Sequence, residues 1–136
     1  MEKITVNVEW CDNNFAAGIG REGLGAIIVT APTYVQLQRE IANALKDHIA
    51  WMVDDGDDVP EWMIAGDYEL DYQPTASALL QSYSPDVTLS SLSRASGINK
   101  SLLSHYANGL KTPRPAQRQR IVDGLHAIGR RLLAAQ

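Results

Sequence analysis

The N-terminal part of the chain alternates apolar and polar positions in short stretches, which is the pattern of half-buried β-strands. In the first stretch the polar residues share one face, and the other face carries Ile4, Val6, Val8 and Trp10. An Asp-Asn-Asn turn signal follows at 12–14, and two further stretches at 15–19 and 26–30 are separated by a glycine-rich loop. The pattern predicts three strands, the third of them (AIIVT) more buried than the others.

A helix is expected after Pro32 and Thr33, because apolar residues then recur about every four positions. Its apolar side consists of Leu37, Ile41, Leu45, Ile49 and Met52. The run at 54–60 predicts a loop, since it combines aspartates with a glycine and a proline. Alternation returns at 67–72 (DYELDY), which predicts a fourth strand with Tyr68, Leu70 and Tyr72 facing inward. The first half is therefore expected to fold as β-β-β-α-β.

Residues 89–109 carry the pattern of two short helices joined by a tight turn. The apolar positions of their shared core are Leu89, Leu92, Ile98, Leu103 and Tyr106. Gly97 falls at the turn, where a residue that tolerates positive φ is favoured. Ser93 and Ala95 are small enough for the helices to cross closely, and Asn99 is placed to cap the second helix. The sequence therefore predicts a helix-turn-helix.

The second of these helices is expected to present a polar face away from its buried side. That face carries Lys100, Ser101, Ser104 and His105. A polar to basic face at a helix N-terminus is what enters the major groove of DNA. The alternative interpretation is a helical hairpin packed inside another kind of all-helical domain.

A longer helix is predicted at the end of the chain, with Pro115 at its first position. Its apolar stripe has spacings of four, three and four and consists of Ile121, Leu125, Ile128 and Leu132. This helix is longer than one small helical domain needs, so we expect the stripe to form a homodimer or a higher homo-oligomer as well as part of the local core. A dimer suits DNA, because two recognition helices then read two half-sites one helical turn apart.

Charge divides the chain into two parts. Residues 1–74 hold four basic and fourteen acidic side chains, a net charge of −10, whereas residues 75–136 hold eight basic and two acidic ones, a net charge of +6. The basic part suits a polyanion, and the acidic part suits a basic partner. We therefore expect an α+β chain with two domains, 1–74 and 75–136, that serve two functions.

Cysteine content and hydropathy indicate where in the cell the protein is expected. Cys11 is the only cysteine, so the chain has no intrachain disulfide and no cysteine-rich zinc site. The first ten residues alternate like a strand and are not typical of a signal peptide, and no apolar run reaches membrane-spanning length. We expect a cytoplasmic protein that does not associate with a membrane.

The segment 88–113, TLSSLSRASGINKSLLSHYANGLKTP, resembles the DNA-binding helix-turn-helix of the phage Cro/repressor (XRE-like) superfamily. The resemblance rests on the turn glycine, the buried apolar positions, and an Asn-Gly exit followed by a basic loop that ends in proline. One departure is that Ser90 and Ser91 stand where the family commonly has an acidic pair, which weakens a capping box. The resemblance implies operator binding through Asn99, Lys100, Ser101, Ser104, His105, Lys111 and Arg114.

The β-β-β-α-β order, which runs into a helix and a helix-turn-helix, resembles the HicB family of bacterial antitoxins. In that family the N-terminal strands form a partial RNase H-like sheet. HicB proteins neutralise HicA toxins, which are small basic ribonucleases that cleave mRNA, and many repress their own operon. The resemblance implies a HicA-like toxin and double-stranded operator DNA as partners. Candidate toxin-binding residues are the carboxylates Asp54, Asp55, Asp57, Asp58, Asp67, Glu69 and Asp71.

Catalysis is not expected of the N-terminal domain. RNase H-like nucleases need several carboxylates that converge on two metal ions, and the first strand here has Glu9 near its end but no central aspartate. The 54–58 run lacks the closing glutamate of an EF-hand loop, and His48 lies close to the apolar side of its helix, where packing is favoured. The sequence therefore predicts no metal and no cofactor.

The alternative function is a stand-alone transcription regulator whose sheet binds a small effector or oligomerises. A nuclease-like enzyme is a third possibility.

Overall fold

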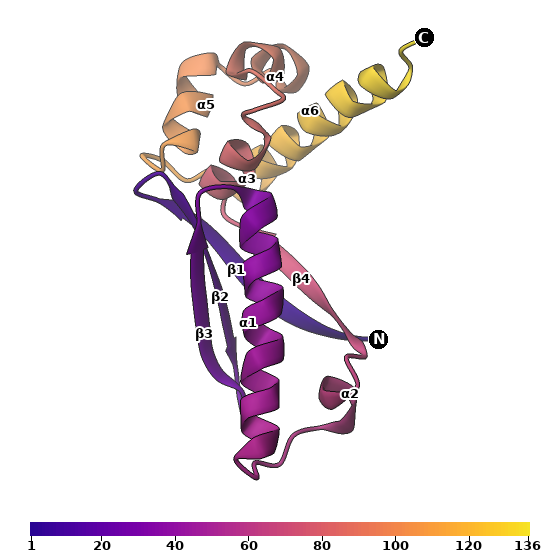
Figure 1. The fold of residues 1–136 in the computed structure, drawn as a ribbon. Helices are drawn as coiled ribbons and strands as arrows, with labels where there is room; N and C mark the ends of the chain where they lie inside the picture. The colour runs from indigo at the N-terminus through magenta and orange to yellow at the C-terminus, as the bar shows by residue number, and fades with distance from the viewer. The chain divides into compact units, whose positions relative to one another are not determined.

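The computed structural model describes residues 1–136 and has an α+β fold, with one mixed four-stranded sheet and six helices (Figure 1). The chain divides into two compact units, an N-terminal unit of Met1–Thr75 and a C-terminal unit of Ala76–Gln136. All four strands belong to the first unit, and the second unit is entirely helical. The α+β class predicted from the sequence is confirmed.

The sheet of the N-terminal unit has the strand order β3-β2-β1-β4. Its strands are β1 (Glu2–Cys11), β2 (Asn14–Arg21), β3 (Gly25–Ala31) and β4 (Tyr68–Pro74). The first three are antiparallel neighbours, whereas β4 pairs with β1 in parallel, with Ile4 opposite Leu70. A parallel pair needs a long crossover, and the chain between β3 and β4 provides it as helices.

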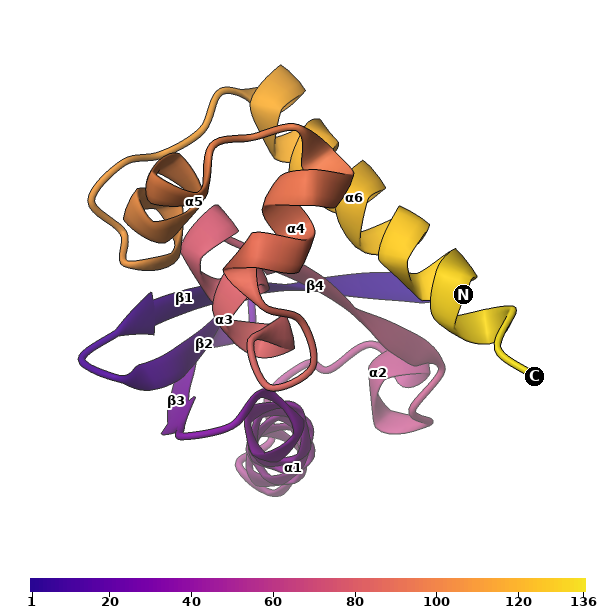
Figure 2. The ribbon, with the colours of Figure 1, turned by 90° about the horizontal axis from the view of Figure 1, so that it is seen from above.

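Helix α1 (Tyr34–Asp54) runs along one face of this sheet (Figures 1 and 2). Thr33 caps it by accepting a hydrogen bond from the Gln36 N–H at 3.2 Å. The predicted apolar side is confirmed, because all five of its members are buried: Leu37, Ile41, Leu45, Ile49 and Met52. They pack against the inward residues of the strands, which include Ile4, Val6, Val8, Phe15 and Ile19.

The expectation of a more buried third strand is wrong. β3 is an edge strand with only its alternate residues turned toward α1, so Ile27 is buried while Ile28 is 75% exposed. A run of apolar residues does not distinguish a strand buried on both faces from one that carries an exposed isoleucine. β4 is the other edge, and its inward residues Tyr68, Leu70 and Tyr72 are half-buried.

A short helix, α2 (Glu61–Ile64), precedes β4 and was not expected from the sequence. Its buried residue is Met63. The chain then reverses at Gly66, whose φ is +77°, and the Asp67 N–H donates to the Trp62 carbonyl at 2.8 Å. This closed turn directs the chain into β4.

The C-terminal unit packs four helices around one core. They are α3 (Ala76–Tyr83), α4 (Leu89–Ser96), α5 (Lys100–Ala107) and α6 (Pro115–Leu133). The core contains every apolar residue predicted for the two short helices, as well as residues of α3 and α6. Its buried members are Leu80, Leu92, Ile98, Leu103, Tyr106, Ala107, Ile121 and Ile128, and Leu89 packs against them partly buried.

Two residues shape the turn between α4 and α5 as the sequence predicts. Gly97 ends α4 in the left-handed conformation, with φ +72°, and its N–H donates to the Ser93 carbonyl. Asn99 caps α5 by accepting a hydrogen bond from the Ser101 N–H at 2.8 Å. In addition, the Ser93 hydroxyl donates to the Ile98 carbonyl at 2.6 Å, which ties α4 to the start of α5.

Helix α6 crosses α4 at a point where no side chain fits. A Cβ atom on Gly124 would lie 3.0 Å from the Cβ of Ser96 and 3.1 Å from Cδ1 of Leu92. One turn earlier, Arg120 donates to the Ser96 carbonyl at 3.2 Å. The glycine in α6 therefore allows the two helices to approach closely.

Candidate nucleic-acid interface

Helix α5 is amphipathic, and its polar side is the candidate DNA-contacting surface. Because Leu103, Tyr106 and Ala107 turn into the core, the residues at helical spacing on the opposite side form one strip. That strip consists of Lys100, Ser101, Ser104, His105 and Asn108. The first two are exposed, and Ser104 and His105 are half-buried. The structure therefore brings together four of the predicted DNA-contacting residues, with Asn99 exposed at the head of the strip.

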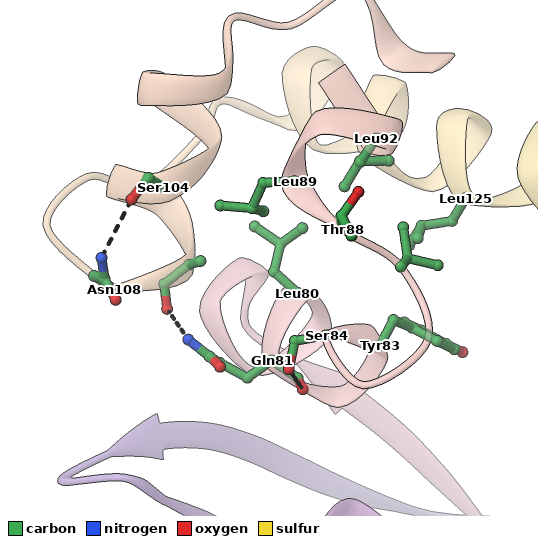
Figure 3. Close-up of a pocket in the computed structure, with 12 residues that line it drawn as sticks. Leu80, Gln81, Tyr83, Ser84, Thr88, Leu89, Leu92, Ser104, Asn108 and Leu125 are labelled. Atoms are coloured by element: carbon green, nitrogen blue, oxygen red, sulfur yellow. Dashed lines mark hydrogen bonds between the residues drawn. The ribbon is translucent and has the colours of Figure 1, made fainter. Parts of the chain in front are cut away.

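Helix α3 fixes the far end of α5. The Ala107 carbonyl accepts hydrogen bonds from the Ser77 hydroxyl at 2.8 Å and from Nε2 of Gln81 at 2.9 Å. Figure 3 shows Gln81 reaching across from α3 to make the second of these bonds. These two residues were not singled out in the sequence, because a serine and a glutamine on a short helix carry no pattern that distinguishes them.

Ser104 is less available than the sequence suggested. It accepts a hydrogen bond from Nδ2 of Asn108 at 3.4 Å and lines a hollow of about 260 Å³ in the C-terminal unit (Figure 3). The same hollow is lined by Leu80 and Leu89. The side chains of Lys100 and Ser101 are exposed and form no hydrogen bond within the unit. These two residues are therefore better placed than Ser104 to contact a base.

The loop after α5 carries two exposed cations. Gly109, with φ +76°, turns the chain out of the helix, and the buried Pro113 holds the loop against the unit. Lys111 lies between these two residues and Arg114 follows Pro113, and both basic side chains are exposed. Neither they nor Lys100 forms an ion pair with a carboxylate. Their charges therefore remain free for an anionic partner.

The stripe of α6 that was expected to form a dimer is largely used inside the unit. Ile121 is 0% exposed and Ile128 is 9% exposed, because α6 needs these residues to pack on α4. The two residues therefore belong to the core of the unit, and a contact of this helix with a second copy stays a prediction. Leu132 is 59% exposed and Leu125 is half-buried, and both line an apolar groove of about 280 Å³ with Leu79, Tyr83, Val87 and Val122.

The candidate toxin-binding carboxylates do not form one cluster. Asp54 is the last residue of α1, and three others follow in the exposed connection to α2: Asp55, Asp57 and Asp58. Asp67 precedes β4. Glu69 and Asp71 instead lie on the side of β4 opposite its inward tyrosines. There Glu69 forms an ion pair with Lys3 at 3.8 Å, and Asp71 accepts a hydrogen bond from Nε2 of Gln73 at 3.0 Å.

His48 and two tryptophans of the N-terminal unit make local contacts. Nε2 of His48 lies 2.6 Å from the Leu24 carbonyl, so this histidine binds the β2–β3 turn. Trp51 is 59% exposed, and the centre of its ring lies 5.9 Å from that of His48. Trp62 is half-buried, with the Arg21 guanidinium 5.2 Å from its ring centre and Tyr68 beside it.

Nowhere in the chain do three histidine, cysteine, aspartate or glutamate side chains converge closely enough to hold a metal ion. None of the helices has the length and apolar character needed to cross a membrane. Comparison with protein families, curated proteins and solved structures finds no match for this chain.

Proposed function

We propose that this protein is an antitoxin that binds and neutralises a HicA-type ribonuclease and represses its own operon. The observation that carries the proposal is that the boundary between the two folded units is also the boundary between the acidic and the basic part of the chain. The chain folds as two compact units, and the division separates a net charge of −10 from a net charge of +6. An acidic unit suits a small basic ribonuclease, and a basic unit suits operator DNA.

The C-terminal unit supports the DNA-binding part of the proposal. Two short helices with a glycine turn and a capped second helix are what a helix-turn-helix requires. In the proposed complex the N-terminal end of α5 lies in the major groove, where Lys100 and Ser101 contact base edges. Lys111 and Arg114 contact the phosphate backbone and set the register without reading sequence.

The N-terminal unit supports the antitoxin part through its topology and charge. Its element order is β-β-β-α-β, interrupted only by the short α2, which is the order expected of a partial RNase H-like sheet in the HicB family. The net charge of −10 on this unit favours a basic partner, so the proposed role of the sheet is to bind a protein.

The test of DNA recognition uses the full chain and a labelled duplex from upstream of its own gene. Lys100→Ala or Ser101→Ala should weaken specific binding by about 1–3 kcal/mol, because a lost base contact costs that much. Binding to a scrambled duplex should change much less. Fluorescence anisotropy measures both affinities.

Arg131→Ala is the matched control, because it removes an exposed charge near the end of α6. It should lower specific and non-specific affinity by the same small factor. Equal losses on both duplexes for Lys100→Ala would contradict base readout by this residue. No specific binding by the full chain would contradict autorepression itself.

A further inference from the structure

The N-terminal unit has an open groove at the end of α1. It lies between the last two turns of α1, the short helix α2 and the beginning of β4, which Figure 1 shows next to one another. Its volume is about 600 Å³. The residues that line it include Ile49 and Val53 of α1, Met63 and Ile64 of α2, and Tyr68 of β4.

The groove has a closed apolar floor and exposed apolar walls. Ile49 and Met63 form the floor, with 6% and 5% of their surfaces exposed. Val53 and Ile64 form the walls and are 43% and 48% exposed. Exposed aliphatic side chains that line a hollow with a buried apolar floor are typical of a surface that binds an apolar side chain.

Backbone hydrogen bonds hold the two walls in place. The Asp57 N–H donates to the Met52 carbonyl at 3.0 Å, which fixes the chain as it leaves α1. The Asp67 N–H donates to the Trp62 carbonyl at 2.8 Å, which closes the turn behind α2. A preformed groove spares a partner the free-energy cost of ordering it.

The surroundings of the groove are strongly acidic. Asp54 lines it, and further exposed carboxylates lie before α2, at its first residue and after it: Asp55, Asp57, Asp58, Glu61 and Asp67. None of these six forms an ion pair. Lys46 is the one basic residue among those that line the groove. Tyr68 also lines the groove and is uncharged at neutral pH, because the usual pKa of a phenol lies well above 7 and burial raises the pKa of Tyr68 further.

We propose that this groove binds a basic amphipathic helix of a partner protein. An apolar side chain of that helix fits between Val53 and Ile64, and its lysines and arginines face the surrounding carboxylates. This is helix-in-groove recognition with charge complementarity at the rim. The inference deepens the proposed function, in which the helix belongs to the basic ribonuclease, and it relocates the contact from Glu69 and Asp71 to the groove.

The first experiment titrates the isotopically labelled full chain with a synthetic peptide and follows amide chemical shifts. The peptide carries leucines at helical spacing with lysine and arginine at the other positions, and a second peptide has glutamates in place of those cations. The basic peptide should bind saturably and shift the amides of the groove walls, and binding should weaken from about 50 to about 500 mM salt as charges are screened. Equal binding of the acidic peptide, or shifts elsewhere only, would overturn the proposal.

Variants locate the contact. Ile64→Asp should lower the affinity for the basic peptide at least tenfold in spite of the added negative charge, because one apolar wall of the groove is lost. Ile28→Asp is the matched control, since Ile28 is also exposed but lies on β3 outside the groove, and it should leave the affinity within about twofold. Both sites are solvent-accessible, so circular dichroism should show both variants folded. An unchanged affinity for Ile64→Asp overturns the groove as the site.

A ribonuclease assay separates this inference from the proposed function. The full chain and its Ile64→Asp variant are mixed with the HicA-type toxin encoded beside the gene and with RNA. If both block cleavage equally, the antitoxin function stands and the groove inference fails. If the wild-type chain leaves cleavage untouched while the basic peptide still binds the groove, the groove stands and the proposed function fails.

Discussion

Gly97 and Asn99 are residues whose roles the sequence predicts, because each has a local backbone requirement. A positive φ favours glycine, and a helix N-terminus favours a side-chain acceptor. Gly124 illustrates the opposite case. It lies in the middle of α6, where glycine is disfavoured, and only the packing of α4 against it explains the choice.

This packing gives a prediction about stability. Gly124→Ala should destabilise the C-terminal unit by about 1–3 kcal/mol, because the new methyl group would press on Ser96 and Leu92 at close to 3 Å. Thermal denaturation of the full chain measures the effect. Ser96 meets this methyl group with backbone as well as side-chain atoms, so relaxation is limited.

Gly129→Ala is the matched control within the same helix. No atom lies within 4 Å of a Cβ added there, so alanine should stabilise α6 by up to about 1 kcal/mol through its higher helix propensity. If both substitutions raise the melting temperature, the close crossing of α4 and α6 is wrong.

At the scale of elements, the predictions succeed where one periodic face serves one core. The apolar sides of α1 and of the first strand are buried as expected. The predictions fail where one hydrophobic pattern is compatible with two different structures. An apolar stripe on α6 is equally compatible with a local core and with a dimer, and its packing on α4 assigns Ile121 and Ile128 to the core.

A dimer contact through α6 is therefore predicted at its exposed leucines. Leu132→Glu should dissociate a dimer and weaken operator binding, with the helical content unchanged because Leu132 is 59% exposed. Light scattering gives the mass, and anisotropy gives the DNA affinity. Ile121→Glu, by contrast, should unfold the unit, since a charge would replace a side chain with 0% exposure.

Leu110→Glu is the control for Leu132→Glu. Leu110 is 72% exposed in the loop after α5, so the same change in charge there should leave the mass unaltered. A Leu132→Glu protein that retains the mass of the wild-type dimer would exclude α6 as the dimer contact.

At the scale of the whole molecule, the division of charge follows the division of the fold. The sequence predicts both, because a sum over residues and a change of hydrophobic period need no tertiary information. It does not predict the groove beside α2, because three separate elements line this groove: Ile49 and Val53 of α1, Ile64 of α2 and Tyr68 of β4. The binding surface of the acidic unit therefore could not be read from its carboxylates alone.

If each unit carries one function, the N-terminal unit should act by itself. Residues 1–75, expressed alone, should bind the HicA-type ribonuclease and block RNA cleavage, because neutralisation needs only a surface that covers the path of the RNA. The fragment keeps the net charge of −10, so association should be fastest at low salt and slow down as the Debye length shrinks. Cleavage assays and stopped-flow binding at about 50 and about 500 mM salt measure the two effects.

Residues 76–136 serve as the control: they should bind the operator and leave the ribonuclease active. A fragment 1–75 that is folded by circular dichroism but leaves cleavage untouched, while the full chain blocks it, would show that neutralisation requires both units.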